Sequence, residues 1–140
     1  RPWPYGSVSD MVVKQNQIWI SSPGSGLVVL DRALDRTKLI SHFDRQNFRV
    51  VNVLLTDLEG NIWTGSRNGL SRTQGDAVEH LESLEPATDQ NILALAVDRS
   101  DRIWFSSREG LFVRNPSRNG IPATIARKLQ GTSFSKEVII

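Results

Sequence analysis

The segment "GNIWTGSRNGL" (Gly60–Leu70) recurs as "DRIWFSSREGL" (Asp101–Leu111), and a looser copy, "NQIWISSPGSGL", spans Asn16–Leu27. The tryptophans of successive copies are separated by 44 and then 41 residues. Self-similarity at a fixed period of this length indicates a repeat architecture in which each copy is one supersecondary unit. The repeat therefore organises most of the 140-residue chain.

Each copy is predicted to form four short β-strands, because apolar or β-branched runs alternate with turn residues at even spacing. The first strands are expected at Val8–Val13, Val51–Thr56 and Ile92–Val97. The second, tryptophan-bearing strands are expected at Gln17–Ser21, Asn61–Gly65 and Arg102–Ser106. The third strands are expected at Leu27–Asp31, Leu70–Thr73 and Leu111–Arg114. The fourth, less regular strands are expected at Lys38–His42, Ala77–Leu81 and Ala123–Lys128.

The turns between these strands contain residues suited to tight backbone geometry. An aspartate such as Asp57 accepts hydrogen bonds from backbone N–H groups two residues on, and Gly60 tolerates a left-handed conformation. Asp101 occupies the equivalent position and tolerates that conformation better than most residues. The glycines before the third strands are expected to close their loops with positive φ; they are Gly26, Gly69 and Gly110. The small Ala94 and Ala96 suit a crowded first strand near a central axis.

A period of 40–50 residues with four strands per unit predicts an all-β fold built of β-propeller blades. The units are 8–49, 50–90 and 91–133, preceded by a linker or donated strand at 1–7 and followed by the start of a further blade at 134–140. Closed propellers have four to eight blades. About three blades would leave two apolar faces bare, so we expect a piece of a longer propeller or a ring closed by several copies. The sequence starts at Arg1 and ends in "EVII", and from these ends we expect a longer parent protein.

Composition excludes several classes of function. The formal net charge is +2, from 17 basic and 15 acidic residues that are scattered along the chain, which gives no basic stripe for nucleic acid. The chain has no cysteine, so disulfides, thiol catalysis and cysteine-based metal sites are excluded. No apolar run reaches the roughly 18 residues of a membrane span.

The segment "ATIARKLQG" leaves open the alternative of one short helix near Ala123–Gln130.

The segments Val50–Arg72 and Asn91–Arg114 resemble the two-component regulator propeller repeat, in which an apolar strand is followed by D-x-x-G-x-I/L-W-x-G-T/S and G-L-x-R. Asp101 and Ser106 replace glycines of that pattern, and the first copy departs further. Similar "GNIWFT" repeats occur in propeller lyases such as the streptogramin lyases. The resemblance implies a periplasmic sensory segment of a bacterial membrane receptor whose output is a histidine kinase or diguanylate cyclase.

The resemblance thus implies a segment that binds or senses and does not catalyse, with no cofactor. The membrane would be reached only through parts of the parent that this chain does not contain. Further blades of that parent, or another copy of the chain, are the expected protein partners. Two alternatives remain: a lectin-like protein whose copies assemble one propeller, and an enzyme of the lyase type.

The loops after the second strands are the candidate binding region, because equivalent loops of all blades gather around one mouth of the channel and scaffold-held loops often carry function. Arg67 and Arg108 share one repeat position and would form part of a basic ring for a polar or anionic small ligand, including a carbohydrate. The ligand-facing side chains are expected to be Ser25, Asn52, Arg67, Asn68, Asn91, Arg108 and Glu109.

Other chemistry is disfavoured by the sequence. His42 and His80 belong to fourth strands of different units, so neither catalysis nor metal ligation is expected of them. The aspartates of the turns offer too few oxygens for calcium, and no serine has the spacing of a nucleophile elbow. The repeat tryptophans are expected to pack between blades, although stacking on sugars is the alternative. Trp3, flanked by prolines, belongs to the linker or donated strand.

Overall fold

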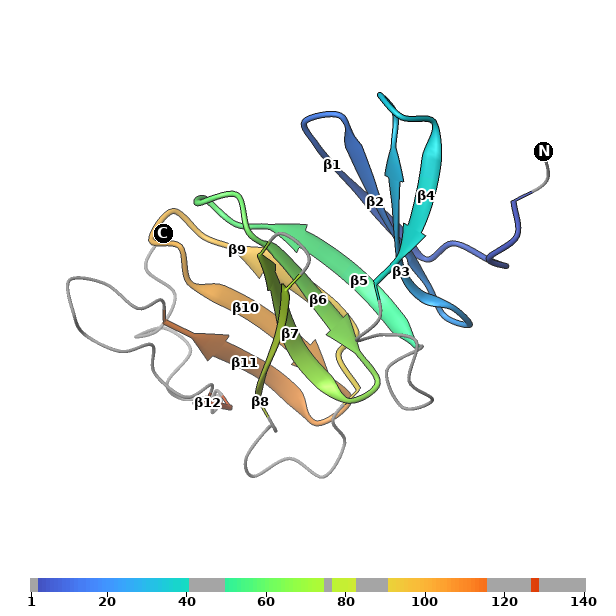
Figure 1. Cartoon of the computed structure of the whole chain (residues 1–140). Helices are drawn as coiled ribbons and strands as arrows, with labels where there is room; N and C mark the ends of the chain where they lie inside the picture. The colour runs from blue at the N-terminus through green and yellow to red at the C-terminus, as the bar shows by residue number, and fades with distance from the viewer. Residues whose placement is uncertain (1–2, 41–49, 75–76, 83–90, 116–126, 129–140) are drawn as a thin grey trace.

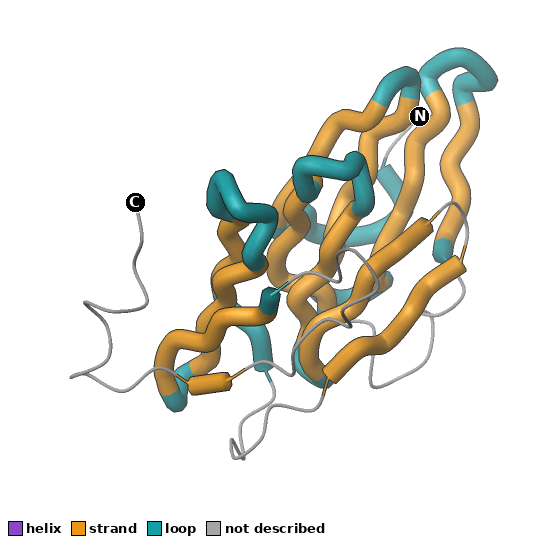
Figure 2. Tube along the Cα trace, turned by 90° about the vertical axis from the view of Figure 1, so that its left-hand side faces the viewer, coloured by secondary structure: helices purple, strands orange, loops and turns teal. Residues whose placement is uncertain are grey.

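The computed structural model describes residues 3–40, 50–74, 77–82, 91–115 and 127–128. These residues form three antiparallel four-stranded sheets, each made by consecutive strands (Figure 1). The described part of the chain contains strands and loops without a helix (Figure 2). It accordingly contains no helix that is long and apolar enough to cross a membrane. The predicted all-β architecture of three four-stranded repeats is confirmed.

The strand bounds follow the repeat. Sheet 1, which is blade 1, consists of β1 (Asp10–Lys14), β2 (Gln17–Ser22), β3 (Gly26–Asp31) and β4 (Arg36–Leu39). Blade 2 consists of β5 (Val51–Thr56), β6 (Ile62–Ser66), β7 (Gly69–Gln74) and β8 (Ala77–Glu82). Blade 3 consists of β9 (Ala94–Val97), β10 (Ile103–Ser107), β11 (Gly110–Arg114) and β12 (Arg127–Lys128). Neighbouring strands pair in this order within each blade.

Most predicted strands lie within one or two residues of the observed ones. The first strands of blades 1 and 3 begin two residues later than predicted, at Asp10 and Ala94. The helix suggested near the C-terminus is wrong where it can be checked, because Arg127 and Lys128 pair with β11 as a strand. Its remaining residues, and His42 of the first blade, lie outside the described residues.

The predicted turn conformations are confirmed. Gly60 has a φ of 85° and Asp101 a φ of 61°, so both take the left-handed region that the hairpin requires. The three glycines that open the third strands also have positive φ, between 91° and 141°. They are Gly26, Gly69 and Gly110. The repeat therefore conserves its backbone geometry even where the turn residue changes from glycine to aspartate.

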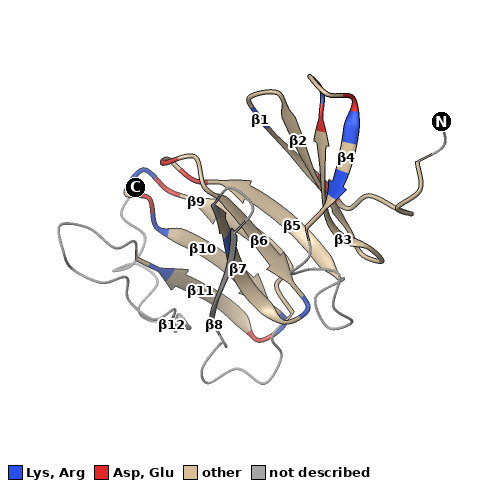
Figure 3. Cartoon of the chain, in the orientation of Figure 1, with Lys and Arg blue, Asp and Glu red and all other residues tan. Residues whose placement is uncertain are grey.

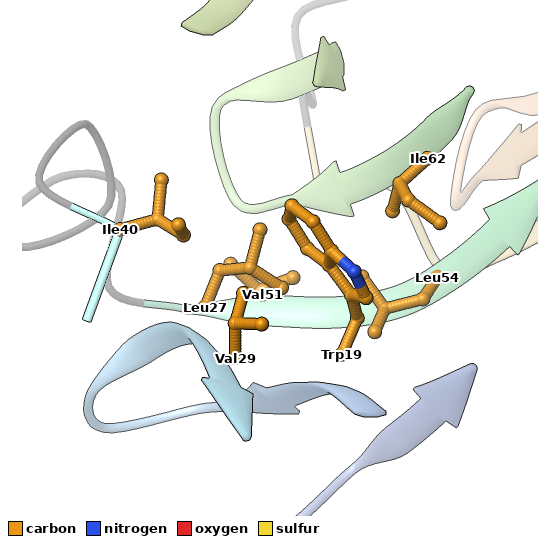
Figure 4. Packing of buried hydrophobic residues seen from close by; sticks show 7 residues of the cluster. All are labelled: Trp19, Leu27, Val29, Ile40, Val51, Leu54 and Ile62. Carbon is orange, nitrogen blue, oxygen red and sulfur yellow. The ribbon is translucent and has the colours of Figure 1, made fainter. Parts of the chain in front are cut away.

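The core consists of two apolar layers, one between each pair of neighbouring blades. Trp19, Leu27 and Val29 of blade 1 pack on Val51, Leu54 and Ile62 of blade 2, with Ile40 beside them (Figure 4). A second layer joins blades 2 and 3, and its buried members are Trp63, Leu70, Ile92, Ile103, Phe105 and Phe112. The expectation that Trp19 and Trp63 pack between blades is confirmed.

The turn aspartates have a role that the sequence did not reveal, because each also fixes a tryptophan. Asp57 accepts backbone N–H bonds from Glu59 and Asn61 through Oδ1, and its Oδ2 accepts the indole N–H of Trp63 at 2.8 Å. Asp98 accepts the indole N–H of Trp104 at the same distance. The aspartate therefore joins the turn to the apolar layer.

Asp98 shows the electrostatic consequence of this arrangement. Burial raises the pKa of Asp98, but hydrogen bonds from the Trp104 indole, from Arg102 and from the Ser100 N–H outweigh it and lower the pKa below its ordinary value. A carboxyl with a lowered folded-state pKa stabilises the fold above its unfolded pKa, and this contribution is lost as the pH falls through the folded value. The turn is therefore stabilised at neutral pH.

Polar bonds also join neighbouring blades. The backbone N–H of Leu54 in β5 donates to Asp10 Oδ2 of blade 1 at 2.9 Å. The N–H of Leu58, in the β5–β6 turn, donates to Asp101 Oδ1 of blade 3 at 3.1 Å. Ser9 donates its hydroxyl to the carbonyl of Val51 at 2.9 Å. These bonds fix the register of one blade on the next.

One buried hydroxyl in the middle blade is left without a hydrogen bond. Thr64 is 0% exposed, and its Oγ1 has no partner among the described residues. An unpaired buried hydroxyl costs about 1–3 kcal/mol, so Thr64→Val should raise the free energy of unfolding by about 1 kcal/mol in urea titrations. Thr73→Val is the matched control, since the Thr73 hydroxyl donates to the Ile62 carbonyl at 3.0 Å and its loss should destabilise. Equal effects of the two substitutions would contradict this prediction.

No further blade covers the outer faces of blades 1 and 3 within the part of the chain that the structure describes. Met11 of blade 1 is 59% exposed, whereas Leu54 at the same repeat position of blade 2 is 5% exposed. On blade 3, Ala94, Ala96, Trp104 and Leu111 line a shallow apolar hollow of about 120 Å³. The expectation of a crowded position for Ala94 and Ala96 is wrong in this chain, because both are exposed with no blade beyond them among the described residues.

Candidate functional site: loops between the second and third strands

Each of the three loops that follow β2, β6 and β10 begins after a buried serine. Ser22, Ser66 and Ser107 end these strands and are at most 7% exposed. The Ser66 hydroxyl accepts the N–H of Asn68 at 3.2 Å, and the Ser107 hydroxyl accepts the N–H of Glu109 at 3.1 Å. The loop serines are therefore structural and are not placed as nucleophiles.

Arg67 and Arg108 occupy the same position of their loops and are both exposed. The Arg67 N–H donates to the carbonyl of Val50 at 2.9 Å, which fixes the loop against the start of β5. Asn68 and Glu109, the next residues, are half-buried. Strand register places these loops at the same end of neighbouring blades. The two exposed arginines therefore belong to equivalent loops of blades 2 and 3.

Asn52 and Asn91 come together at the start of the first strands of blades 2 and 3. The Asn52 Nδ2 donates to Asn91 Oδ1 at 2.8 Å and to the Ile92 carbonyl at 2.7 Å. Asn52 lies where β5 departs from regular pairing, between Val51 and Val53. This pair joins two blades, so its amide groups already have protein partners. A ligand at this point would have to compete with that bond.

Ser25 is held by the N-terminal segment. The hydroxyl groups of Ser25 and Ser22 both donate to the carbonyl of Tyr5, at 3.0 and 2.8 Å. The Tyr5 hydroxyl lies 3.1 Å from the Thr37 hydroxyl in β4, and the Trp3 ring packs edge-on against the Tyr5 ring. The first loop therefore differs from the other two, because the N-terminal segment accepts a hydrogen bond from its Ser25 hydroxyl.

The remaining candidates are limited by what the structure describes. His42 lies outside the described residues, and His80 is described only as a backbone position of β8. Within the described ranges no group of three or more histidine, cysteine or acidic side chains is placed to hold a metal ion. The turn aspartates Asp57 and Asp98 use their oxygens for turn N–H groups and for indoles.

Two arginines gather on the buried Trp63 at the opposite end of the blades, an arrangement that the sequence did not reveal. Arg72 of β7 and Arg114 of β11 place their guanidinium carbons 5.6 and 5.4 Å from the centre of the Trp63 ring. These distances permit cation–π attraction. The sequence does show that each arginine lies near the end of a third strand, which is the feature that could have pointed to this contact.

Comparison with solved structures places the fold among propellers. The chain is similar to the extracellular domain of BT4673 of B. thetaiotaomicron, described as a hybrid two component system, with a TM-score of 0.70 and 17% identity over 89% of this chain. It is also similar to the corresponding domain of BT3049, with a TM-score of 0.62 and 18% identity over 84% of this chain. The chain spans 16% of the length of each of these proteins.

A third similar structure is an enzyme, virginiamycin B lyase from Staphylococcus aureus. Its TM-score is 0.65, with 14% identity over 89% of this chain and 42% of the lyase. No protein-family model and no curated protein matches the sequence. At identities this low, the structural similarity shows a shared fold alone. The chain is accordingly described as three blades of a β-propeller.

Proposed function

We propose that this chain is a non-enzymatic, ligand-binding propeller segment of a bacterial membrane receptor, located outside the cytoplasm and coupled to a two-component or diguanylate cyclase output in its parent protein. The observation that carries the proposal is the pair of exposed arginines at one repeat position of neighbouring blades. The fold similarity to extracellular domains of two-component systems supports the sensory role.

The ligand of these loops is a small polar or anionic molecule. Guanidinium groups bind carboxylates and phosphates through paired, charge-assisted hydrogen bonds. Asn68 and Glu109 beside the arginines add groups that select hydroxyls, which makes acidic carbohydrates a suitable class. No residue of the described loops is arranged as a nucleophile with its base, so binding without turnover is the function proposed.

The arginine pair gives a direct test. Arg67→Ala with Arg108→Ala should weaken the binding of an acidic sugar such as glucuronate by at least about tenfold, because charge-assisted bonds contribute about 1.5–3 kcal/mol each. Chemical-shift titration of the labelled chain measures this, and Arg32→Ala, in the exposed β3–β4 turn, is the control. Unchanged affinity in the double variant would show that the ligand binds elsewhere.

The open faces of blades 1 and 3 are proposed to bind further blades, supplied by the same parent chain or by another copy. The residues at the equivalent positions within the chain are buried by the next blade, as Trp19 and Trp63 are, at 4% and 3% exposure. Trp104 and Leu111 have the same residue types and lie on the open face. A neighbouring blade would bury them in the same way.

We expect the isolated chain to associate through these faces, with a mean mass that rises with concentration in light scattering coupled to size exclusion. Met11→Lys and Ala94→Lys should suppress association, because each places a charge on an apolar interface. Leu34→Lys is the control, since Leu34 is 55% exposed in the β3–β4 turn. A single discrete oligomer would favour a second copy as the partner, and a strict monomer would contradict the proposal.

A further inference from the structure

The molecule has two equivalent hollows at the end of the blades opposite the candidate loops. One lies between blades 1 and 2 and has a volume of about 250 Å³. Its lining residues are Lys14, Gln17, Trp19, Val29, Asp31, Arg36, Lys38, Ile62 and Thr73. The other lies between blades 2 and 3, has a volume of about 160 Å³ and is lined around Trp63 in the same way. Because the repeat places them identically, the second hollow is an internal control for the first.

The hollow between blades 2 and 3 is narrowed by two arginine side chains. Arg72 and Arg114 line it and lie over the Trp63 ring. In the hollow between blades 1 and 2, strand register puts Val29 and Thr73 at the equivalent positions. Two long side chains are thus replaced by two short ones. This replacement explains why the first hollow is larger.

The described residues that line the two hollows also have net charges of opposite sign. Asp57, Glu59 and Asp101 line the hollow between blades 2 and 3, where they face the two arginines. Among the described residues that line the hollow between blades 1 and 2, Lys14, Arg36 and Lys38 are basic and Asp31 is acidic. Lys38 and Arg36 lie on the outermost strand β4, which is mostly blue in Figure 3. The described lining of the first hollow therefore carries an excess of two positive charges.

The strand register arranges these groups in two adjacent rows on one sheet face. Lys14, Gln17, Asp31 and Arg36 are successive cross-strand partners over all four strands of blade 1. The neighbouring row contains Trp19, Val29 and Lys38. The inner row supplies the apolar side chains of Trp19 and Val29 together with the charged Lys38, and the outer row is polar. Within the described residues the Trp19 indole N–H donates to Gln17 Oε1 at 3.3 Å, whereas the Trp63 indole N–H donates to Asp57 at 2.8 Å.

From these observations we infer that the hollow between blades 1 and 2 is a binding site for a small oxyanion ligand, one that carries a carboxylate, sulfate or phosphate group. Lys14, Arg36 and Lys38 bind the anionic group, and the floor of Trp19, Val29 and Ile62 accepts a short apolar part. The volume is below the 300–1,000 Å³ typical of sites for larger ligands, so the ligand is no bigger than a simple sugar acid or sugar phosphate. This site is independent of the loop arginines.

The test is a titration of the nitrogen-15-labelled chain with inorganic phosphate, sulfate and glucuronate, with glucose as the neutral comparison. The Trp19 indole resonance should shift with the anions and saturate, whereas glucose should leave it unchanged. Trp63, in the narrower hollow lined by Arg72 and Arg114, supplies a second indole signal that should stay in place. Lys14→Gln with Lys38→Gln should weaken anion binding by about tenfold or more. Arg67→Ala with Arg108→Ala should leave the Trp19 response intact.

A second variant separates a built site from general attraction by positive charge. Val29→Arg with Thr73→Arg copies the two arginines that narrow the neighbouring hollow, so it should weaken the Trp19 response although it adds two positive charges. Nonspecific attraction would instead strengthen binding in this variant. The proposal is overturned if no anion shifts the Trp19 resonance, if the shift survives in the lysine variant, or if the double-arginine variant binds more tightly. Should the double-arginine variant fail to fold, the lysine variant alone decides.

Discussion

Replacing Trp63 by alanine is expected to lower the free energy of unfolding by about 3–5 kcal/mol, as for other large-to-small substitutions of buried aromatic residues. Trp63 is 3% exposed at the centre of the layer between blades 2 and 3. Its loss opens a cavity, leaves Asp57 without its indole donor and removes the ring over which two arginines lie. Urea denaturation followed by circular dichroism measures the effect.

The repeat supplies the matched control in Trp104→Ala. Trp104 has the same partner type, Asp98, but lies on the open face and is only half-buried. Its removal should cost about 1–2 kcal/mol, because less apolar area returns to water. Trp63→Phe keeps most of the ring and removes the N–H, so it should cost an intermediate amount. A loss for Trp104→Ala as large as that for Trp63→Ala would show that the blade interface is not the source of the stability.

Gly65→Ala is the second substitution with a large expected effect, because a single added methyl group meets a neighbouring blade. A Cβ at this position would collide with Ile92 Cγ2 and would lie 2.8 Å from Ile92 Cβ and 3.2 Å from Val53 Cγ1. Ile92 is 0% exposed and cannot move away without disturbing the layer. Overpacking of this kind costs about 1–3 kcal/mol, and thermal unfolding should show a lowered midpoint.

A double-mutant cycle decides whether the collision is the cause. In an Ile92→Ala background the added methyl group has room, so Gly65→Ala should then cost little, which gives a strong coupling energy. Gly24→Ala is the surface control, since no heavy atom lies within 4 Å of its added Cβ. It should change stability by less than about 0.5 kcal/mol. Additive effects of Gly65→Ala and Ile92→Ala would contradict the proposed contact.

The sequence predicted the blades well because the information that defines them is local and repeated. The strand β5 was predicted residue for residue at Val51–Thr56, and the left-handed Asp101 was anticipated from its alignment with Gly60. Spacing, turn chemistry and β-branched runs act within one hairpin. The inward packing of Trp19 and Trp63 followed because strands buried on both faces read as continuous apolar runs.

The sequence predicted contacts between blades less well, because these depend on pairs of residues about 40 positions apart. The bond between Leu58 and Asp101, and the approach of Arg72 and Arg114 to Trp63, have no signature in either segment alone. Of the residues expected to face a ligand, Asn52 and Asn91 meet and are hydrogen-bonded to each other. Ser25 was expected to face a ligand, and its hydroxyl donates to the Tyr5 carbonyl. Ligand binding by the loops stays a prediction.

The inter-blade bonds make the chain a short one-dimensional array. The strand β5 of the middle blade packs against both β1 and β9, and each bond described above joins nearest neighbours. The stability of such an array is approximately a sum of intrinsic terms for each unit and coupling terms for each junction. Opening an end unit sacrifices one junction, whereas opening the middle unit sacrifices both. Local unfolding is therefore graded along the chain, and the middle blade is the last part to open.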